Sequence, residues 1–267
     1  MDSLPTLPTL PRPHLAAPLR PLPWRFGELP PPPPSGAAFP LLLLIDRRDA
    51  LAPPHRTSVV PPHPEALLAT LSAAERQRHA SYRRPDDRER FLLARAALRQ
   101  LLGGWLERPP AAVAIAIGPH GKPHCGGAPA FNLSHSGDLI LLGFHSASEV
   151  GVGVDVERER PDLDWRPIAR RVLPPAAVGD LEALPAPEQG QAFLQAWCRL
   201  EARLKAQGEG LAGLDRGRGD GGDAGTPGEA VWEVAVPPGY RAAAALGAAL
   251  RDPQAGAAGG DRPSPRA

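Results

Sequence analysis

Apolar residues recur at helical spacing over a long stretch that begins at Pro85. A proline at the first helical position, followed at once by acidic residues such as Asp86 and Asp87, is typical of a helix start. The pattern therefore predicts a long amphipathic helix. Its apolar stripe consists of Phe91, Ala94, Leu98, Leu101, Leu102 and Trp105.

Short apolar runs bounded by turn residues predict strands at 39–46, 113–117, 130–133, 138–144, 150–156, 231–236 and 240–246. Further helical segments are expected at 64–82, 164–172 and 188–207. Because only a short polar turn separates them, we expect 138–144 and 150–156 to form a hairpin. The order of elements indicates an α+β fold in two halves of similar size, at residues 39–149 and 150–250.

The two ends of the chain differ from its centre. Residues 1–38 hold 12 of the 36 prolines and show little apolar periodicity, and residues 251–267 are similarly rich in proline and glycine. Such segments bury little apolar surface, so both are predicted to be disordered tails with no part in the chemistry. The stretch at 215–228 is predicted to be a flexible glycine-rich loop.

Composition excludes several classes of function. A formal net charge of +1 argues against a protein whose main task is to coat nucleic acid or an anionic membrane. The longest aliphatic block, Leu41 to Ile45, is too short to span a bilayer, and the first residues do not resemble a leader. We therefore expect a cytoplasmic protein. Cys125 and Cys198 are far apart in sequence, so neither a disulfide framework nor a zinc site is predicted.

Two carboxylates follow one another on the predicted strand at 150–156 and its continuation. Because alternate residues of a strand point the same way, Asp155 and Glu157 project from one face. Paired oxygen ligands suit Mg²⁺, which keeps several waters and usually meets a substrate phosphate. Solvated acids at a strand end would show the same pattern, so this pair alone leaves both interpretations open.

Only two of the 30 basic residues are lysines, Lys122 and Lys205. Lys205 lies on the last predicted helix, where Trp197, Glu201 and Lys205 form a stripe at i, i+4 spacing. Glu to Lys pairs at this spacing are common on helix surfaces, so the stripe gains weight because the compact ammonium of lysine is rare in this chain. Lys122 lies in the predicted turn at 118–123, where a plain hairpin loop is the alternative.

The segment 131–138 offers hydrogen-bond donors for an anion between two predicted strands. It contains the only asparagine of the chain, Asn132, and His135 flanked by Ser134 and Ser136. A single histidine is more often structural than functional. An arginine-rich region upstream is either a solvated face or a platform for phosphates and an acidic partner, and it comprises Arg76, Arg78, Arg83, Arg84, Arg88, Arg90 and Arg95.

Taken in order, these segments resemble the motifs of the phosphopantetheinyl transferase superfamily, in particular its long, monomeric type that activates surfactin synthetase. The matching segments are 121–123, 131–137, 153–157, the helix positions Trp197, Glu201 and Lys205, and 238–241. The resemblance implies two similar halves related by a pseudo-twofold axis, each a small and mostly antiparallel sheet with helices. Coenzyme A would lie in the cleft between them.

The resemblance also implies a reaction and a set of site residues. The phosphopantetheine arm of coenzyme A would pass to a serine of an acyl or peptidyl carrier protein with release of 3′,5′-ADP. Mg²⁺ would be held by Asp155, Glu157 and Glu201. Glu201, Lys205 and His135 would take part in catalysis, with Glu201 as base and the other two on the pyrophosphate. Further contacts to coenzyme A are implied for Lys122, Ser134, Arg76, Arg78 and Arg90.

Three positions depart from the family pattern. Leu200 stands where many relatives have lysine, Glu75 stands where a basic residue is frequent, and 174–177 lacks an expected acidic residue. Leu200 leaves open a relative that binds coenzyme A or a carrier protein without turnover. The carboxylates also leave open a metal-dependent phosphoesterase. The intact trio of acids argues against the first alternative, and the lack of a second cluster of Asp and His argues against the second.

Overall fold

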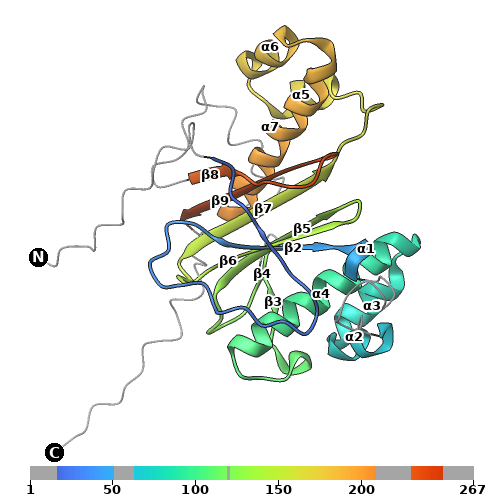
Figure 1. Ribbon diagram of the computed structural model, residues 1–267, viewed down its shortest axis with the longest axis vertical. Helices are drawn as coiled ribbons and strands as arrows, with labels where there is room; N and C mark the ends of the chain where they lie inside the picture. Colours follow the sequence, from blue (N-terminus) through green and yellow to red (C-terminus); the bar gives the residue numbers. More distant parts are fainter. Residues whose placement is uncertain (1–16, 51–62, 119–120, 209–229, 249–267) are drawn as a thin grey trace, which may run out of the picture.

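The computed structural model describes residues 17–50, 63–118, 121–208 and 230–248. The predicted glycine-rich loop at 215–228, the predicted tail at 251–267 and residues 1–16 lie outside these ranges. The described chain is a mixed α+β fold, as expected, in which small sheets carry helices on their outer faces (Figure 1).

The strands form two main sheets and one short hairpin. The first sheet has the order β1-β2-β6-β5, with β1 (Leu22–Pro23), β2 (Leu41–Asp46), β5 (Ala130–Ser136) and β6 (Leu139–His145). The second has the order β7-β9-β8, with β7 (Val150–Arg158), β8 (Ala230–Glu233) and β9 (Tyr240–Ala248). All pairs are antiparallel except β1 with β2. The short hairpin pairs β3 (Ala116–Ile117) with β4 (Pro123–His124).

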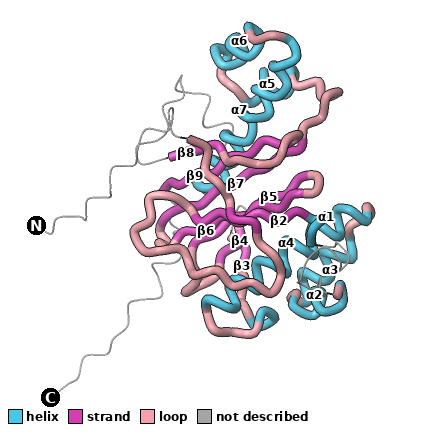
Figure 2. The backbone as a smooth tube through the Cα atoms, in the orientation of Figure 1, coloured by secondary structure: helices cyan, strands magenta, loops and turns pink. Residues whose placement is uncertain are grey.

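Helices surround both sheets, and their distribution is visible in Figure 2. Those of the first half are α1 (Arg47–Ala50), α2 (Pro64–Thr70), α3 (Ala73–Ser81), α4 (Pro85–Trp105) and the short 3₁₀ helix η2 (Pro110–Ala112). Those of the second half are α5 (Arg166–Val172), α6 (Pro175–Ala183) and α7 (Ala186–Gln207). The long helix predicted from Pro85 is confirmed as α4. Helix α6 was not predicted, because Pro174 and Pro175 read as breakers although proline is favoured at a helix start.

The predicted hairpin between 138–144 and 150–156 is wrong. Strand β6 is buried along its whole length and pairs with β2 on one side and β5 on the other, so neither edge remains for β7. The actual hairpin joins β5 to β6 through Gly137 and Asp138. After His145 the chain crosses to the second sheet, where β7 pairs with β9 along nine residues.

Each main sheet packs against one long helix. Helix α4 buries Leu98, Leu101 and Leu102 completely against the first sheet. Helix α7 lies against β7 and β9 through small residues, among them Cys198, Ala202 and Ala206. A Cβ atom at Gly153 would overlap the carbonyl oxygen of Ala202, so glycine is required where this helix approaches the strand. The close contact fixes α7 over β7, which matters for the site.

Residues 17–38 do not form a disordered tail, contrary to the prediction for 1–38. Trp24 and Phe26 are buried in the core of the first half, and Trp105 Nε1 donates to the carbonyl of Pro30 at 2.8 Å. The segment contacts both sheets, because Leu19 exchanges backbone hydrogen bonds with the β8 side and Trp24 N donates to Leu44 O of β2 at 2.9 Å. An extended proline-rich strand costs little entropy to order, and its aromatic residues supply the buried surface.

None of the helices in the described ranges combines the length and the apolar character that crossing a membrane requires.

Candidate functional site

The site lies where the two sheets meet, along β5 and β7. Polar side chains of β5 bridge to β7 at regular spacing. Asn132 Oδ1 accepts from Val154 N at 3.0 Å, and Ser134 Oγ donates to Asp155 Oδ1 at 2.9 Å. Ser136 Oγ donates to Glu157 Oε2 at 2.7 Å. Alternate residues of both strands therefore face the same seam.

Helix α7 brings a cation and a third acid to this seam. Lys205 Nζ donates to Asp155 Oδ1 at 2.6 Å and lies 3.4 Å from Ser134 Oγ. Its distance to Glu201 Oε2, one helical turn earlier, is 3.8 Å. The structure thus brings Ser134, Asp155, Glu201 and Lys205 together, although they are far apart in the sequence.

The electrostatics of the seam are unbalanced. Burial raises the pKa of Glu201, and the charges of Asp155 and Glu157 raise it further against the opposing effect of Lys205. The pKa of Glu157 is also raised, first by burial and then by Asp155. Asp155 is only 3% exposed, and its Oδ2 atom is buried without a hydrogen-bond partner. Three carboxylates thus gather near one ammonium, which pairs with Asp155 and Glu201.

The carboxylate oxygens of this seam are candidate ligands for a metal ion. In the part of the chain that the structure describes, no three acidic, histidine or cysteine side chains are already gathered closely enough to hold one. The chemistry nevertheless fits a hard divalent cation, because all donors are oxygens, the cluster is negatively charged and Asp155 Oδ2 has no other partner. Such an ion would still need oxygens from a substrate phosphate or water.

His135 lies beside this cluster on β5. Its side chain is exposed on one side, yet the surrounding protein removes enough water to lower the pKa of the imidazole, and the charges of Arg90 and Lys205 lower it further. The ring is therefore neutral at neutral pH and can accept or donate a hydrogen bond at the edge of the seam.

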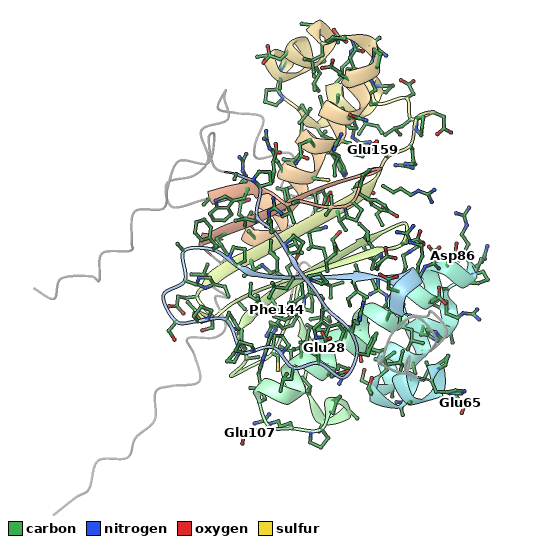
Figure 3. All side chains as sticks on the ribbon, viewed as in Figure 1. Glu28, Glu65, Asp86, Glu107, Phe144 and Glu159 are labelled. Carbon is green, nitrogen blue, oxygen red and sulfur yellow. The ribbon has the colours of Figure 1, made fainter. Side chains whose placement is uncertain are left out.

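A hollow of about 540 Å³ opens next to Ser136 and Glu157. Four arginines line it, Arg84, Arg90, Arg158 and Arg160. Arg90 Nη1 donates to the carbonyl of Gly137 at 3.1 Å, so its guanidinium is held over the β5–β6 turn. Glu159, which follows β7 where the chain leads to α5 (Figure 3), also lines the hollow. The four guanidinium groups outnumber the three carboxylates of the lining, those of Glu157, Glu159 and Asp162, and this excess of positive charge favours an anionic ligand.

The other arginines assigned to the site are more dispersed. Arg76 donates to the backbone carbonyl of Leu71, whereas Arg78 is placed over the ring of Phe91, 5.7 Å from its centroid. Neither contacts the carboxylate cluster. Arg95 is not part of an exposed arginine-rich face, because it is buried and paired with Glu75 at 2.6 Å.

Glu75 has a structural role that explains its departure from the expected basic residue. It accepts from Arg95 Nε at 2.6 Å and from Arg99 Nε at 2.5 Å, and it completes a capping box with Ser72 at the start of α3. Burial alone would raise the pKa of Glu75, but the two guanidiniums and the Ser72 backbone hold it below its ordinary value. A lysine here would face two buried cations.

The ammonium of Lys122 does not face the cluster. Lys122 Nζ donates to three backbone carbonyls, those of Val152 at 3.0 Å, Lys205 at 2.6 Å and Ala206 at 3.0 Å. The resemblance implied that Lys122 contacts coenzyme A. In the structure its ammonium is instead bound to these three backbone carbonyls.

Comparisons with known proteins bear on what this site does. Residues 151–220 match the model of the 4′-phosphopantetheinyl transferase superfamily. The 4′-phosphopantetheinyl transferase AcpT of Escherichia coli is 35% identical over 147 residues, which cover 53% of this chain and 70% of that protein. The chain belongs to the 4′-phosphopantetheinyl transferase superfamily.

Two further relatives match at slightly higher identity. A putative 4′-phosphopantetheinyl transferase of Synechocystis sp. is 37% identical over 149 residues, and the 4′-phosphopantetheinyl transferase HetI of Nostoc sp. is 36% identical over 154 residues. These matches cover 54% and 56% of this chain. The chain spans 60% and 64% of the length of those relatives, less than two thirds in each case.

Two residues of this site lie in segments that the sequence singled out, but the sequence assigned them no separate role. These are Ser136, which binds Glu157, and Tyr240, whose hydroxyl accepts from Asp138 N at 2.9 Å. A Cβ at Gly137 would overlap Tyr240, so the tyrosine holds the β5–β6 turn closely. The two-residue spacing of Asn132, Ser134 and Ser136 was a signal that Ser136 faces the seam. Tyr240 lies in the matching segment 238–241, but the sequence assigned it no role, because it acts on the β5–β6 turn from another sheet.

Proposed function

We propose that the chain transfers the 4′-phosphopantetheine group of coenzyme A to a serine of an acyl or peptidyl carrier protein and releases 3′,5′-ADP. The observation that supports this most is the meeting of Lys205 and Glu201 on α7 with Asp155 on β7 and Ser134 on β5. Acids and a lysine are thereby held together in a seam that has an excess of negative charge and an arginine-lined hollow beside it.

Mg²⁺ is the cofactor that this set of oxygens suits, with Asp155, Glu157 and Glu201 as the residues that would hold it. When bound, it would offset the negative charge that spreads over the phosphate oxygens during transfer. The free Oδ2 atom of Asp155 and the raised pKa values of Glu157 and Glu201 support this, because each indicates missing positive charge.

The residues of the chain then have distinct tasks. The serine oxygen of the carrier forms a bond to the phosphorus that bears pantetheine, and the bond from that phosphorus to the bridging oxygen of the pyrophosphate breaks. Glu201 takes the serine proton as general base. Lys205 neutralises charge on the departing phosphate, and the neutral imidazole of His135 donates a hydrogen bond to a phosphate oxygen.

The finer features of the family belong to the same proposal. We place coenzyme A between the two halves, which we take to be related by a pseudo-twofold axis, in a monomer of the long, surfactin-synthetase-activating type. Ser134 orients Asp155, and Arg90, at the rim of the hollow, is placed to meet a phosphate of coenzyme A. Arg76 and Arg78 would contact coenzyme A farther from the seam. The protein would act in the cytoplasm, without nucleic acid or membrane partners.

A mass measurement on the carrier tests the proposal. The full chain is incubated with Mg²⁺, coenzyme A and an apo carrier protein, and the carrier should gain the mass of one phosphopantetheine group. Glu201→Gln should abolish this gain, whereas Glu188→Gln, an exposed acid in the first turn of the same helix, should not change it. Hydrolysed coenzyme A with an unmodified carrier would instead identify a phosphoesterase. Binding of coenzyme A with no product would identify a relative without turnover.

A further inference from the structure

Lys122 uses all of its hydrogen-bond donors on backbone carbonyls. An ammonium has three N–H donors, and here they meet the carbonyl oxygens of Val152, Lys205 and Ala206 at 2.6 to 3.0 Å. Among the described residues, no carboxylate is paired with it. This ammonium could bind a phosphate only if at least one of its three hydrogen bonds to these carbonyls were broken.

The acceptors explain why a cation is placed here. Helix α7 ends at Gln207, so Lys205 and Ala206 belong to the last turn, where the regular i+4 hydrogen bonds of the helix end; the carbonyl of Lys205 also accepts from Gly208 N at 3.3 Å. The negative end of the helix dipole also favours a cation at this position. Gly208 ends the helix in the left-handed region with φ 77°, and a Cβ atom there would lie 3.6 Å from Lys122 Cδ. The stem of Lys122 thus packs on the end of the helix.

The third acceptor links the helix end to the strand that carries Asp155. Val152 belongs to β7, and it lies between Gly151 and Gly153, the two positions where α7 approaches the strand most closely. A Cβ atom at Gly151 would overlap the carbonyl oxygen of Ala206. Lys122 therefore reaches from the end of the β3–β4 loop to the point where the helix end and β7 already touch.

The helix end matters because it carries Lys205. The backbone carbonyl of Lys205 is bound by Lys122, while the side chain of Lys205 binds Asp155 Oδ1 at 2.6 Å. One residue thus connects both contacts. We propose that Lys122 is a positioning residue, which fixes the last turn of α7 on β7 and thereby the placement of Lys205 against Asp155, and that its ammonium does not bind coenzyme A.

Burial agrees with this geometry. It lowers the pKa of the Lys122 ammonium to about 8, as expected for a cation that is removed from water without a carboxylate partner. At neutral pH the group still carries the proton that its three acceptors require. The proposal rests on the proposed function only in so far as the reaction that Lys205 serves is phosphopantetheine transfer.

The two lysines of the chain permit a direct test on the unaltered protein. Lysine labelled with ¹⁵N at Nζ gives two side-chain signals, which the spectrum of Lys205→Arg assigns. We expect the Lys122 signal to exchange its protons slowly with water and to stay in place when coenzyme A or 3′,5′-ADP is added. The Lys205 signal should shift. A Lys122 signal that exchanges quickly, or that shifts as much as the Lys205 signal, would overturn the proposal.

Kinetics of a double-mutant cycle supply a second test. If Lys122 acts through Lys205, Lys122→Met should lower kcat more than it raises KM for coenzyme A, and its effect should largely vanish in a Lys205→Met background. If Lys122 bound coenzyme A directly, Lys122→Met would instead raise KM for coenzyme A. The loss of activity in the double variant would then be the product of the losses in the two single variants. His124→Ala, an exposed neighbour on β4, is the control for disturbance of the hairpin and should behave as wild type.

The two proposals fail in different ways. If the unaltered chain transfers nothing to any carrier, the proposed function is wrong. The proton exchange rate of the Lys122 signal still tests whether Lys122 is bound to the end of α7. If transfer occurs but the Lys122 signal responds to coenzyme A, the function stands and the positioning role falls. The spectra need no Lys122 variant, so a variant that does not fold leaves the test intact.

Discussion

Two clusters of charged side chains, one at each long helix, differ in how their charges are balanced. At α4, a single carboxylate, Glu75, is shared by Arg95 and Arg99, and Arg99 Nη1 also reaches the carbonyls of Pro110 and Val113 at 2.9 and 3.0 Å. At α7, the ammonium of Lys205 lies within ion-pair distance of two carboxylates, Asp155 and Glu201, a third acid, Glu157, lies nearby, and one oxygen of Asp155 has no hydrogen-bond partner.

The difference separates a structural cluster from a functional one. In the Glu75 cluster each carboxylate oxygen has a donor, so the cluster joins α3 to α4 and needs nothing further. In the Asp155 cluster the pKa values of Glu157 and Glu201 are raised, because their ionised forms are destabilised. A bound cation would remove this destabilisation. Residue type alone does not distinguish the two, because both combine carboxylates with cations from a long helix. The following changes would break or sharpen this distinction.

The largest effect is expected for Glu75→Ala. It would leave two buried guanidiniums without their carboxylate, and loss of one partner from such a cluster destabilises by about 3–5 kcal/mol. The free energy of unfolding from urea titration measures this. Glu65→Ala, at an exposed acid of α2, should change it by less than about 0.5 kcal/mol. Equal stability of the two variants would show that the Glu75 cluster is not structural.

Asp155→Asn should have the opposite profile, with activity lost and the fold retained. Loss of charge stabilisation at the phosphate predicts a decrease in kcat of about a hundredfold or more, and excess Mg²⁺ should restore it only in part. Stability should stay constant or rise, because a negative charge leaves an already negative cluster. EDTA should abolish wild-type transfer. Transfer that persists in EDTA, or an Asp155→Asn protein with normal kcat, would refute the metal assignment.

Lys205→Arg should impair turnover although it keeps the charge. The ammonium fits between Asp155 Oδ1 at 2.6 Å and Ser134 Oγ at 3.4 Å, and a planar guanidinium cannot occupy the same point. We expect kcat to fall about tenfold, which corresponds to about 1.4 kcal/mol. Arg199→Lys on the same helix, where the guanidinium pairs with Glu233, tests the reverse exchange at an exposed position and should leave kcat unchanged. Wild-type turnover of Lys205→Arg would show that lysine is incidental there.

The Glu75 cluster should also affect how much stability the protein loses at acid pH. The pKa of Glu75 is held below its ordinary value of 4.5, so its stabilising contribution is present above that pH and is lost as the pH falls through the lower, folded-state pKa. Glu75→Gln, which cannot ionise, should therefore lose less stability than wild type on acidification. Melting temperatures measured between neutral and acid pH would reveal this, and parallel curves would contradict it.

The smallest effect is expected for Leu200→Lys. Leu200 precedes Glu201 on α7 and is half-buried, so a lysine there would add a cation near the carboxylate cluster. KM for coenzyme A should fall, by less than about tenfold, because an exposed ammonium gains at most about 1 kcal/mol from a phosphate. Leu184→Lys, on the connection before α7, is the control. An unchanged KM would show that the family lysine is dispensable here.

Much of the site follows from the sequence itself. The helix from Pro85, the pairing of Asp155 with Glu157 on one strand face and the stripe of Glu201 and Lys205 all come from periodicity within a few residues, and the structure contains each of these elements. Local rules suffice because side-chain direction in a helix or strand depends only on the backbone of neighbouring residues.

Other features depended on tertiary contacts between distant segments. The strand partner of β7, the ordering of residues 17–38, the pairing of Glu75 with Arg95 and the capture of Lys122 by the end of α7 each join residues 20 to more than 80 positions apart. Whether a lysine meets a phosphate or a carbonyl, and whether an arginine lies on a surface or beside a buried acid, is decided by which surfaces the folded chain brings into contact. The sequence specified which charged groups are present, and only the packing of α7 on β7 and of α3 on α4 determined which of them were left without a partner.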